Sequence, residues 1–202
     1  MKNKLIISLM LIIIFGFLLG LVLFIEIPRL GYTYDETTNS YIITHCYGNA
    51  KEYDIPSTYK DKPISGIARE VFRDKTKLEK IDLSKTSITK IDIATFSGCT
   101  NLAEITFPSS LKYIANNAFF RCSSLEKVDL TSTNLTILAG SVFFSCTNLK
   151  YVYLPDSLEK IGSYAFYDTA IVELSLPKTV RLLDDNALAG VDAANIIYRS
   201  NL

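Results

Sequence analysis

Residues 114–130 read IANNAFFRCSSLEKVDL, and residues 154–166 read LPDSLEKIGSYAF. Together these two stretches display a pattern that recurs along the chain every 22 to 24 residues. Each copy opens with an aliphatic residue, and the copies begin at Ile67, Ile91, Ile114, Leu138, Ile161 and Leu183. Self-similarity at a fixed period of this length is typical of repeat architectures.

The copies agree at further positions. Four and five residues after each opening come a small or branched residue and then an aromatic residue or leucine: Val71-Phe72, Thr95-Phe96, Ala118-Phe119, Val142-Phe143, Ala165-Phe166 and Ala187-Leu188. An LxxLxL-type run follows in five copies: Leu78-Ile81-Leu83, Leu102-Ile105-Phe107, Leu125-Val128-Leu130, Leu149-Val152-Leu154 and Ile171-Leu174-Leu176. So regular a recurrence over more than half of the chain predicts one structural unit repeated in space.

The repeat predicts a solenoid, because a single coil of about 23 residues cannot bury its own apolar side chains. Apolar residues alternate at the end of LxxLxL as they do in a strand. A proline such as Pro155 ends that strand because it has no N–H to donate. The spacing from the opening residue to the aromatic residue fits a short helical turn. We therefore predict an α/β-type repeat solenoid, a leucine-rich repeat with short strands on one face, short helical turns opposite, and one N-terminal transmembrane helix.

The quoted stretches resemble the BspA-like, treponemal-type leucine-rich repeat, whose pattern I-G-x-x-A-F-x-x-C-x-x-L-x-x-I-x-L-P-x-S-L they carry almost intact. The resemblance covers about residues 32–198, including an opening Tyr-rich stretch similar to the family's usual first coil. The chain departs from the pattern in its last coil, which lacks Phe and Pro, and at Lys75, Thr169 and Val191, where Cys is expected. The resemblance implies a surface protein that acts in adhesion and protein binding, without identifying a ligand.

An uncharged apolar run extends from Leu5 to Ile25. As a helix it would be roughly 31 Å long, close to the ~30 Å hydrocarbon core of a bilayer. Lys2 and Lys4 precede it, so the positive-inside rule favours a cytoplasmic N-terminus and extracytoplasmic repeats. The alternative is a cleaved signal peptide and a secreted protein, but the run is longer than the usual apolar region and no A-x-A-like site follows.

Two glycines within this run, Gly16 and Gly20, fit the GxxxG spacing of helix dimers. Glycines are also common in membrane helices, so a weak helix dimer and no dimer both remain open. The predicted organisation is a signal anchor over residues 1–30, an N-terminal capping coil over 31–66, and leucine-rich repeats of about 23 residues over 67–202.

The cysteines follow the repeat. Cys99, Cys122 and Cys146 occupy the same position in three successive copies, which predicts a column of buried structural thiols. A metal site needs converging ligands, and a row of equivalent residues does not supply them. A disulfide between neighbours remains open, because export permits oxidation. His45, the only histidine, is adjacent to Cys46, and adjacent strand residues point to opposite faces, which argues against a catalytic pair.

The composition of the chain narrows the range of possible functions and partners. Lys+Arg and Asp+Glu are equal at 21 each, so nothing indicates a nucleic acid partner. The sequence contains no paired catalytic carboxylates, phosphate loop or nucleophile motif, and we predict no enzyme, cofactor or metal site. Asp184-Asp185 is interpreted as a solubilising pair in the last coil. The remaining classes are a recognition module that binds an extracellular protein or glycan, and a non-catalytic scaffold subunit of an envelope complex.

A candidate binding surface follows from the strand alternation. The outward positions of most copies carry mixed charges, but the fourth copy has Tyr151 and Tyr153 beside Lys150. Tyrosine is enriched at interfaces because it offers rigid area and a hydroxyl group. We predict a binding surface at Tyr151, Tyr153, Lys150, Lys127 and Asp129. The alternative, that these tyrosines are ordinary strand residues, remains open.

Overall fold

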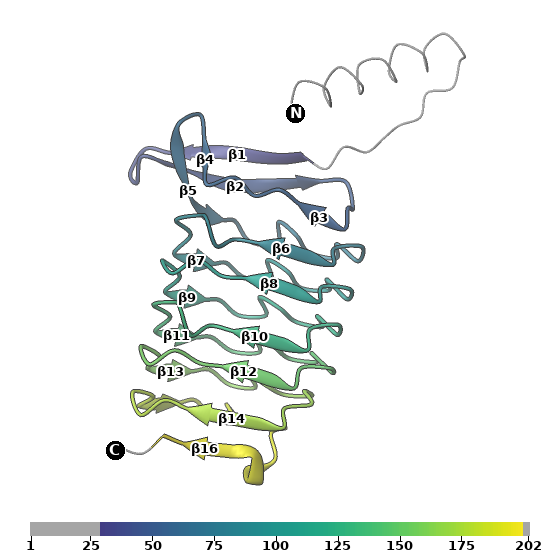
Figure 1. The fold of residues 1–202 in the computed structure, drawn as a ribbon, viewed down its shortest axis with the longest axis vertical. Helices are drawn as coiled ribbons and strands as arrows, with labels where there is room; N and C mark the ends of the chain where they lie inside the picture. Colours follow the sequence, from purple (N-terminus) through teal and green to yellow (C-terminus); the bar gives the residue numbers. More distant parts are fainter. Residues whose placement is uncertain (1–28, 200–202) are drawn as a thin grey trace, which may run out of the picture.

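The computed structural model describes residues 29–199 (Figure 1). The predicted transmembrane segment from Leu5 to Ile25, with Gly16 and Gly20, lies outside these residues. Among residues 29–199, no helix is long and apolar enough to cross a membrane.

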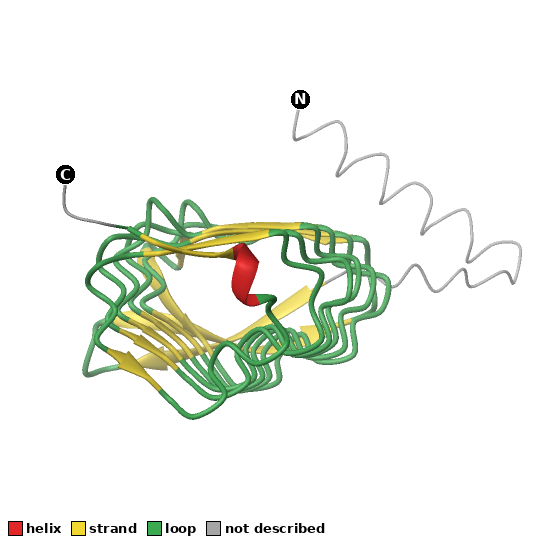
Figure 2. Ribbon diagram, turned by 90° about the horizontal axis from the view of Figure 1, so that it is seen from below, coloured by secondary structure: helices red, strands yellow, loops and turns green. Residues whose placement is uncertain are grey.

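The described chain is a β-solenoid, so the predicted repeat stack is confirmed. Most coils contribute two short strands, which lie on different sides of the flattened coil (Figure 2). The strands are β1 (Arg29–Asp35), β2 (Ser40–Tyr47), β3 (Glu52–Tyr53), β4 (Thr58–Tyr59), β5 (Lys62–Ile67), β6 (Lys80–Asp82), β7 (Lys90–Ile91), β8 (Glu104–Thr106), β9 (Tyr113–Ile114), β10 (Lys127–Asp129), β11 (Ile137–Leu138), β12 (Tyr151–Tyr153), β13 (Lys160–Ile161), β14 (Glu173–Leu176), β15 (Leu182–Leu183) and β16 (Ile196–Tyr198).

On one side of the stack, a long sheet runs in the order β1-β2-β5-β7-β9-β11-β13-β15, with β4 paired to β5. On the other side are two shorter sheets, β3-β6-β8 and β10-β12-β14-β16. Successive coils pair their strands in parallel, because each coil repeats the direction of the one before. The strands of the LxxLxL runs therefore lie where the sequence predicts them.

The predicted short helical turns are wrong. The opening aliphatic residues, such as Ile91 and Ile114, lie in a second parallel strand of each coil. The stretch that follows is a series of turns, because residues such as Asn117 and Arg121 adopt positive φ angles and interrupt any helical run. Its backbone N–H groups donate to the next coil, as Phe119 N does to Val142 O at 2.9 Å. Within residues 29–199 the only helix is a single 3₁₀ turn, η1 (Ala193–Asn195).

The core is a ladder of aromatic rings along the stack. Phe72, Phe96, Phe119, Phe143 and Phe166 are fully buried, and their successive centroids lie 5.1, 5.2, 5.5 and 6.0 Å apart. The rings are stacked nearly parallel, and the leucines and isoleucines of the LxxLxL runs pack around them. This single continuous cluster holds the coils together and fixes their register.

The corners after the strands explain why the repeat length alternates. Where Pro108 or Pro155 turns the chain, the period is 23 residues; where Thr86 or Thr133 does so, it is 24. Each of these threonine hydroxyls donates to the carbonyl three residues earlier, at 2.7 Å, so the longer corner is closed by its own side chain. Both corner types return the chain to the same register in the long sheet.

The two ends of the stack differ. At the N-terminal end, β1 and β2 form an antiparallel hairpin that lies across the first coil (Figure 1). At the C-terminal end, Leu183 and Tyr198 occupy positions that face the core in other coils, but no following coil is present within residues 29–199 and both are exposed. The strand β16 is held there by Arg199, which reaches back to Asp156.

Candidate binding face

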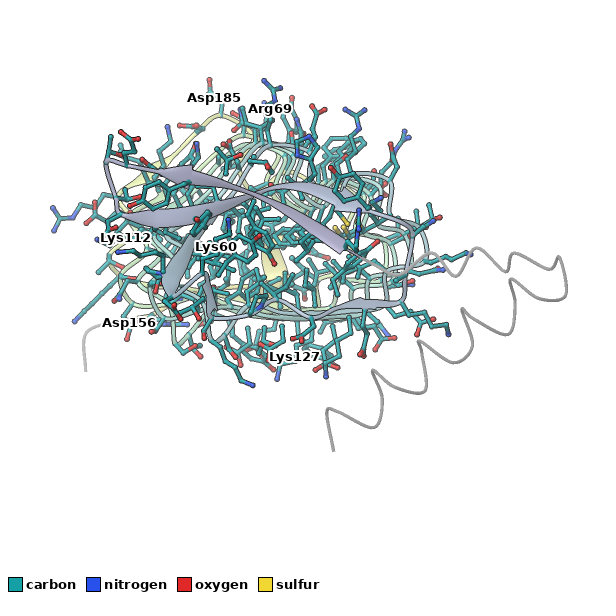
Figure 3. The ribbon with its side chains drawn as sticks, turned by 90° about the horizontal axis from the view of Figure 1, so that it is seen from above. Lys60, Arg69, Lys112, Lys127, Asp156 and Asp185 are labelled. Atoms are coloured by element: carbon teal, nitrogen blue, oxygen red, sulfur yellow. The ribbon has the colours of Figure 1, made fainter. Side chains whose placement is uncertain are left out.

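The strand register brings the predicted tyrosines side by side with their charged neighbours. Lys127 pairs with Tyr151 and Asp129 with Tyr153 between β10 and β12. Because Val152 between them is buried in the core, Tyr151 and Tyr153 both point outward and are 44% and 43% exposed. Lys127 is labelled along this long side of the coil in Figure 3.

Contacts link Lys127 to both of its neighbours. Its ammonium Nζ lies 5.0 Å from the centroid of the Tyr153 ring and 4.0 Å from Asp129 Oδ2. A cation over a tyrosine face is attracted by the ring quadrupole, by about 0.5–1 kcal/mol at an exposed site. Lys127 therefore supports the Tyr153 ring in its outward position.

Asp129 has a local structural contact as well. Its Oδ1 accepts hydrogen bonds from Thr131 Oγ1 at 2.7 Å and from Thr131 N at 3.1 Å. The Thr131 side-chain hydrogen bond is the largest cause that lowers the pKa of Asp129. Asp129 thus closes the corner after β10, and Lys150, the fifth predicted residue, is half-buried immediately before β12.

Two residues outside the predicted binding surface extend this patch. Val172, just before β14, and Ile197, in the middle of β16, are both exposed. Ile197 pairs with Ser175 of β14. Ser175 lies two residues after Glu173, which pairs with Tyr151 of β12. The outward face of β10, β12, β14 and β16 therefore carries aromatic and apolar side chains beside charged ones such as Asp129 and Glu173. We give the name tyrosine face to five of its residues: Lys127, Tyr151, Tyr153, Val172 and Ile197.

The neighbouring face of β3, β6 and β8 has a different character. Lys51 Nζ lies 2.7 Å from Glu79 Oε1, and Lys80 Nζ lies 2.6 Å from Glu104 Oε1. The hydrogen bonds to Glu79 and Glu104 are the largest causes that raise the pKa values of Lys51 and Lys80. These charges neutralise one another across adjacent coils. The sheets themselves separate between β8 and β10, where the charged surface gives way to the tyrosine face.

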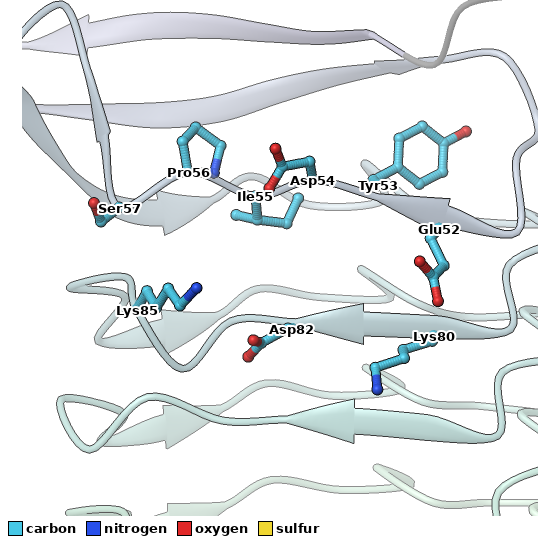
Figure 4. Close-up of a pocket in the computed structure, with 9 residues that line it drawn as sticks. All are labelled: Glu52, Tyr53, Asp54, Ile55, Pro56, Ser57, Lys80, Asp82 and Lys85. Carbon is cyan, nitrogen blue, oxygen red and sulfur yellow. The ribbon is translucent and has the colours of Figure 1, made fainter. Parts of the chain in front are cut away.

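A hollow of about 500 Å³ lies at the N-terminal end of the charged face (Figure 4). Its lining comes from β3, β6 and the segments that follow them: Glu52, Tyr53, Asp54, Ile55, Pro56, Ser57, Lys80, Asp82 and Lys85. Asp82 accepts from Ser84 N at 2.9 Å, and this hydrogen bond is the largest cause that lowers its pKa. Across residues 29–199, no three His, Cys, Asp or Glu side chains are grouped so that they could hold a metal ion.

The column of cysteines lies in the core. Cys99, Cys122 and Cys146 are fully buried free thiols, and each lies 3.0–3.1 Å from the carbonyl oxygen of a phenylalanine in the preceding coil. Burial raises the pKa of Cys99 and of Cys146 to about 12. The three side chains are therefore neutral hydrogen-bond donors, and an apolar setting of this kind makes a thiol chemically inert.

The adjacent residues His45 and Cys46 face different environments in β2. His45 is exposed, and its ring is stacked against Tyr47 with the centroids 5.9 Å apart. Cys46 packs against the core, and burial is the largest cause that raises the pKa of its thiol. This arrangement offers no nucleophile and base in contact.

A second row of aromatic side chains runs along the turns outside the core. The rings of Phe120, Phe144 and Tyr167 are stacked, with successive centroids 5.4 and 4.9 Å apart. Each ring directly follows a core phenylalanine in the sequence, so the repeated aromatic pairs at 119–120, 143–144 and 166–167 are a signal that could have identified this row.

Comparisons with known proteins agree with this geometry. A family model described as BspA type leucine rich repeat region matches residues 65–194 with six copies. A leucine-rich repeat protein of T. pallidum is 28% identical, with a TM-score of 0.69, over 79% of this chain and 82% of that one. No curated protein matches.

Two further solved structures are similar to this chain over part of their own length. A leucine rich cell surface protein of Faecalibacterium prausnitzii is 24% identical, with a TM-score of 0.68, over 87% of this chain and 55% of that chain. The pneumococcal vaccine antigen PcpA is 26% identical, with a TM-score of 0.58, over 78% of this chain and 44% of that chain. Since the family model covers more than half of the sequence and five successive coils share the phenylalanine ladder, the chain belongs to the BspA type leucine-rich repeat family.

Proposed function

We propose that this chain is a membrane-tethered cell-surface module that binds an extracellular protein through the tyrosine face, and so acts in recognition or adhesion. The observation that carries the proposal is the contrast between the two halves of one side of the stack. The charged half satisfies its own side chains, whereas Tyr151, Tyr153 and Ile197 are exposed without an apolar covering among residues 29–199. Exposed aromatic clusters on rigid sheets are typical of interaction sites.

Rigid presentation favours a macromolecular ligand. Neighbouring strands hold Tyr151 and Tyr153 on backbone hydrogen bonds, so little conformational entropy is lost when a partner covers them. Tyr151 and Tyr153 point outward from a sheet and are 44% and 43% exposed, which suits a protein surface better than an enclosed small molecule. The comparisons indicate no catalytic family, in keeping with a binding module.

Site-specific photocrosslinking in living cells tests the binding face. A photoreactive phenylalanine analogue replaces Tyr153 in the full chain, and the same analogue at Tyr167, which is exposed on the outer turns, is the control. We expect a crosslinked protein from position 153 and none from position 167. A glycan ligand would give a crosslink to carbohydrate instead. Equal crosslinking at the two positions, or none at position 153, contradicts the proposal.

A reporter fused to the C-terminus tests the tether and the orientation. We expect a full-length product in the membrane fraction, with the reporter accessible to external protease. A shortened product in the medium would indicate a cleaved signal peptide and a secreted repeat protein. A protected internal reporter would overturn the cell-surface proposal and favour a scaffold subunit.

A further inference from the structure

The N-terminal end of the stack carries a cluster of tyrosines from three strands. Tyr32 of β1 is stacked on Tyr59 of β4 with their centroids 4.1 Å apart, and Tyr41 of β2 meets Tyr59 edge-on at 4.9 Å. Tyr34 of β1 lies 5.2 Å from Tyr41. Tyr34 leaves part of this cluster uncovered, since its side chain is 42% exposed. Tyr47 lies at the other end of the hairpin, where it pairs with Arg29, and is 50% exposed.

Cationic side chains accompany these rings. The Arg29 guanidinium lies 5.9 Å from the centroid of Tyr47, and Lys60 Nζ lies 5.6 Å from that of Tyr59. Lys60 is in the turn between β4 and β5, which reaches past β1 at the N-terminal end of the stack (Figure 1). Acids also lie at this end of the stack: Asp61 is next to Lys60 in the β4–β5 turn, and Asp35 and Glu36 are at the hairpin tip, at the opposite end of β1 from Arg29.

The distance along the chain from the apolar run to this end is short. Only residues 26–28 separate Ile25, the last residue of the apolar run, from Arg29, where β1 begins. Four extended residue steps reach at most about 14 Å. The headgroup layer of one leaflet is itself roughly 5–8 Å thick, from the difference between total and hydrocarbon thickness. If the run spans the bilayer, β1 must therefore begin in or directly above the headgroups.

We infer that the N-terminal end of the solenoid, formed by β1, β2 and the β4–β5 turn, is a lipid-docking surface, with Tyr34 and Tyr47 placed among the outer headgroups. This inference rests on the membrane tether of the proposed function. Tyrosine suits the interface because its ring is apolar and its hydroxyl stays wet. Lysine and arginine extend their charged groups toward headgroup phosphates while their alkyl chains remain near the apolar region.

The consequence is a defined orientation of the binding face. Strands in the long sheet are about 4.8 Å apart, so the coil that carries Tyr151 and Tyr153 stands roughly 20–25 Å from the docked hairpin. Docking of the N-terminal end would hold the axis of the stack perpendicular to the bilayer. The tyrosine face would then point parallel to the membrane plane, clear of the bilayer. A flexible tether alone would leave that face free to tilt against the membrane.

The absence of tryptophan from the sequence allows a direct test. Tyr34→Trp and Tyr47→Trp each place a single fluorophore in the proposed docking surface, and Tyr164→Trp places one at an exposed tyrosine near the other end of the stack. The full-length variants are reconstituted in phosphatidylcholine vesicles with or without a nitroxide-labelled headgroup lipid. We expect the labelled lipid to quench the emission of the first two variants by about half or more, and to leave Tyr164→Trp unchanged, since nitroxide quenching acts only at short range.

Flotation of the vesicles separates the two proposals. If the chain does not float with the vesicles, the membrane tether of the proposed function fails, and the docking surface with it. If the chain floats, but Tyr34→Trp and Tyr47→Trp are quenched no more than Tyr164→Trp, the tether stands and the docking surface is overturned. Two separate docking variants keep the test valid if one substitution disturbs the hairpin, and circular dichroism of each variant reports whether the stack has folded.

Discussion

At the scale of single residues, the position three residues after a core phenylalanine carries a side-chain hydrogen-bond donor in four successive coils: Cys99, Cys122, Cys146 and Thr169. Cys122 donates to Phe96 O and Cys146 to Phe119 O, both at 3.1 Å. At the equivalent position of the next coil, Thr169 donates instead to a carbonyl of its own coil, Phe166 O, at 2.8 Å. A cysteine fits because it is small, apolar in volume and still supplies an S–H group to a buried carbonyl.

This role predicts how the stability of the protein depends on pH. A thiol whose pKa is about 12 when folded, against roughly 8.5 when unfolded, keeps its proton in the folded state as the unfolded chain loses it. The free energy of unfolding should therefore be fully retained below about pH 8.5 and decline as the pH rises toward 12. Urea unfolding at pH 7.5 and pH 10.5 measures the loss.

The variant Cys146→Ala is the control for that measurement. It lacks the titrating thiol, so its loss between the two pH values should be smaller than that of the natural chain. At pH 7.5 it should already be less stable by about 0.5–1.5 kcal/mol, because Phe119 O loses the thiol donor and keeps only that of Cys122 N. An equal alkaline loss in both proteins would show that Cys146 does not contribute to it.

Close backbone contact leaves no room for a side chain at Gly162. A Cβ atom on Gly162 would lie 2.5 Å from Gly140 N and 2.6 Å from Ala139 C, both backbone atoms of the preceding coil. Gly162→Ala should separate the two coils and lower the free energy of unfolding by about 1–3 kcal/mol, as overpacking does. Gly66→Ala is the matched control, because its Cβ would meet Ile42 at an ordinary 3.5 Å. Thermal unfolding that shows equal Tm changes for the two variants contradicts this account.

At the scale of secondary-structure elements, the sequence predicts one strand per coil and misses the other. The LxxLxL run Leu149-Val152-Leu154 contains β12, in which buried and exposed residues alternate. The outward direction of Tyr151 and Tyr153 could therefore be predicted from the sequence. The second strand, such as Lys90–Ile91, has only two residues, which is too short for any periodicity to reveal. Ile197 was missed for a related reason: its place on the tyrosine face depends on the register of β16 against β14, which follows from three-dimensional pairing.

The last strand is held by its pairing with β14 and by the side chain of Arg199. Within residues 29–199, β16 pairs on one side only, with β14. Arg199 fastens it by donating from Nη1 to Asp156 Oδ1 at 2.7 Å, from Nε to Ser175 Oγ at 3.0 Å and from Nη2 to Leu154 O at 3.1 Å. The guanidinium group thus joins the last coil to the two before it, as a planar fork of donors allows.

Removal of this side chain should loosen β16 without disturbing the stack. In Arg199→Ala we expect faster hydrogen–deuterium exchange at the amides of residues 196–198, and unchanged exchange in β12. Arg181→Ala is the control, because Arg181 is exposed and makes no ion pair among the described residues. Similar exchange at residues 196–198 in both variants would mean that pairing with β14 alone holds the strand.

At the scale of the whole molecule, each coil packs only on its neighbours, so stability is shared along one dimension. The same arrangement separates the surfaces: the tyrosine face lies along the side of the stack, and the tyrosine cluster of β1 and β2 lies at its end. A substitution in one surface should therefore leave the other folded, which is what permits the binding and docking experiments to be interpreted independently.

The core ladder gives the clearest prediction at this scale. Phe119 stands between two stacked rings, at 5.2 and 5.5 Å, whereas Phe166 has a ladder ring on one side only, at 6.0 Å. Phe119→Ala removes the packing of both halves of the stack onto its centre, so it should cost about 3–5 kcal/mol and destabilise the whole chain. Phe166→Ala should cost less and act mainly on the last coils, because the coils before it keep both neighbours. Urea unfolding, together with hydrogen–deuterium exchange at the amides of β6, distinguishes the two variants. Faster exchange at β6 is expected for Phe119→Ala alone. An equal effect of both variants would show that the stack unfolds as one cooperative unit.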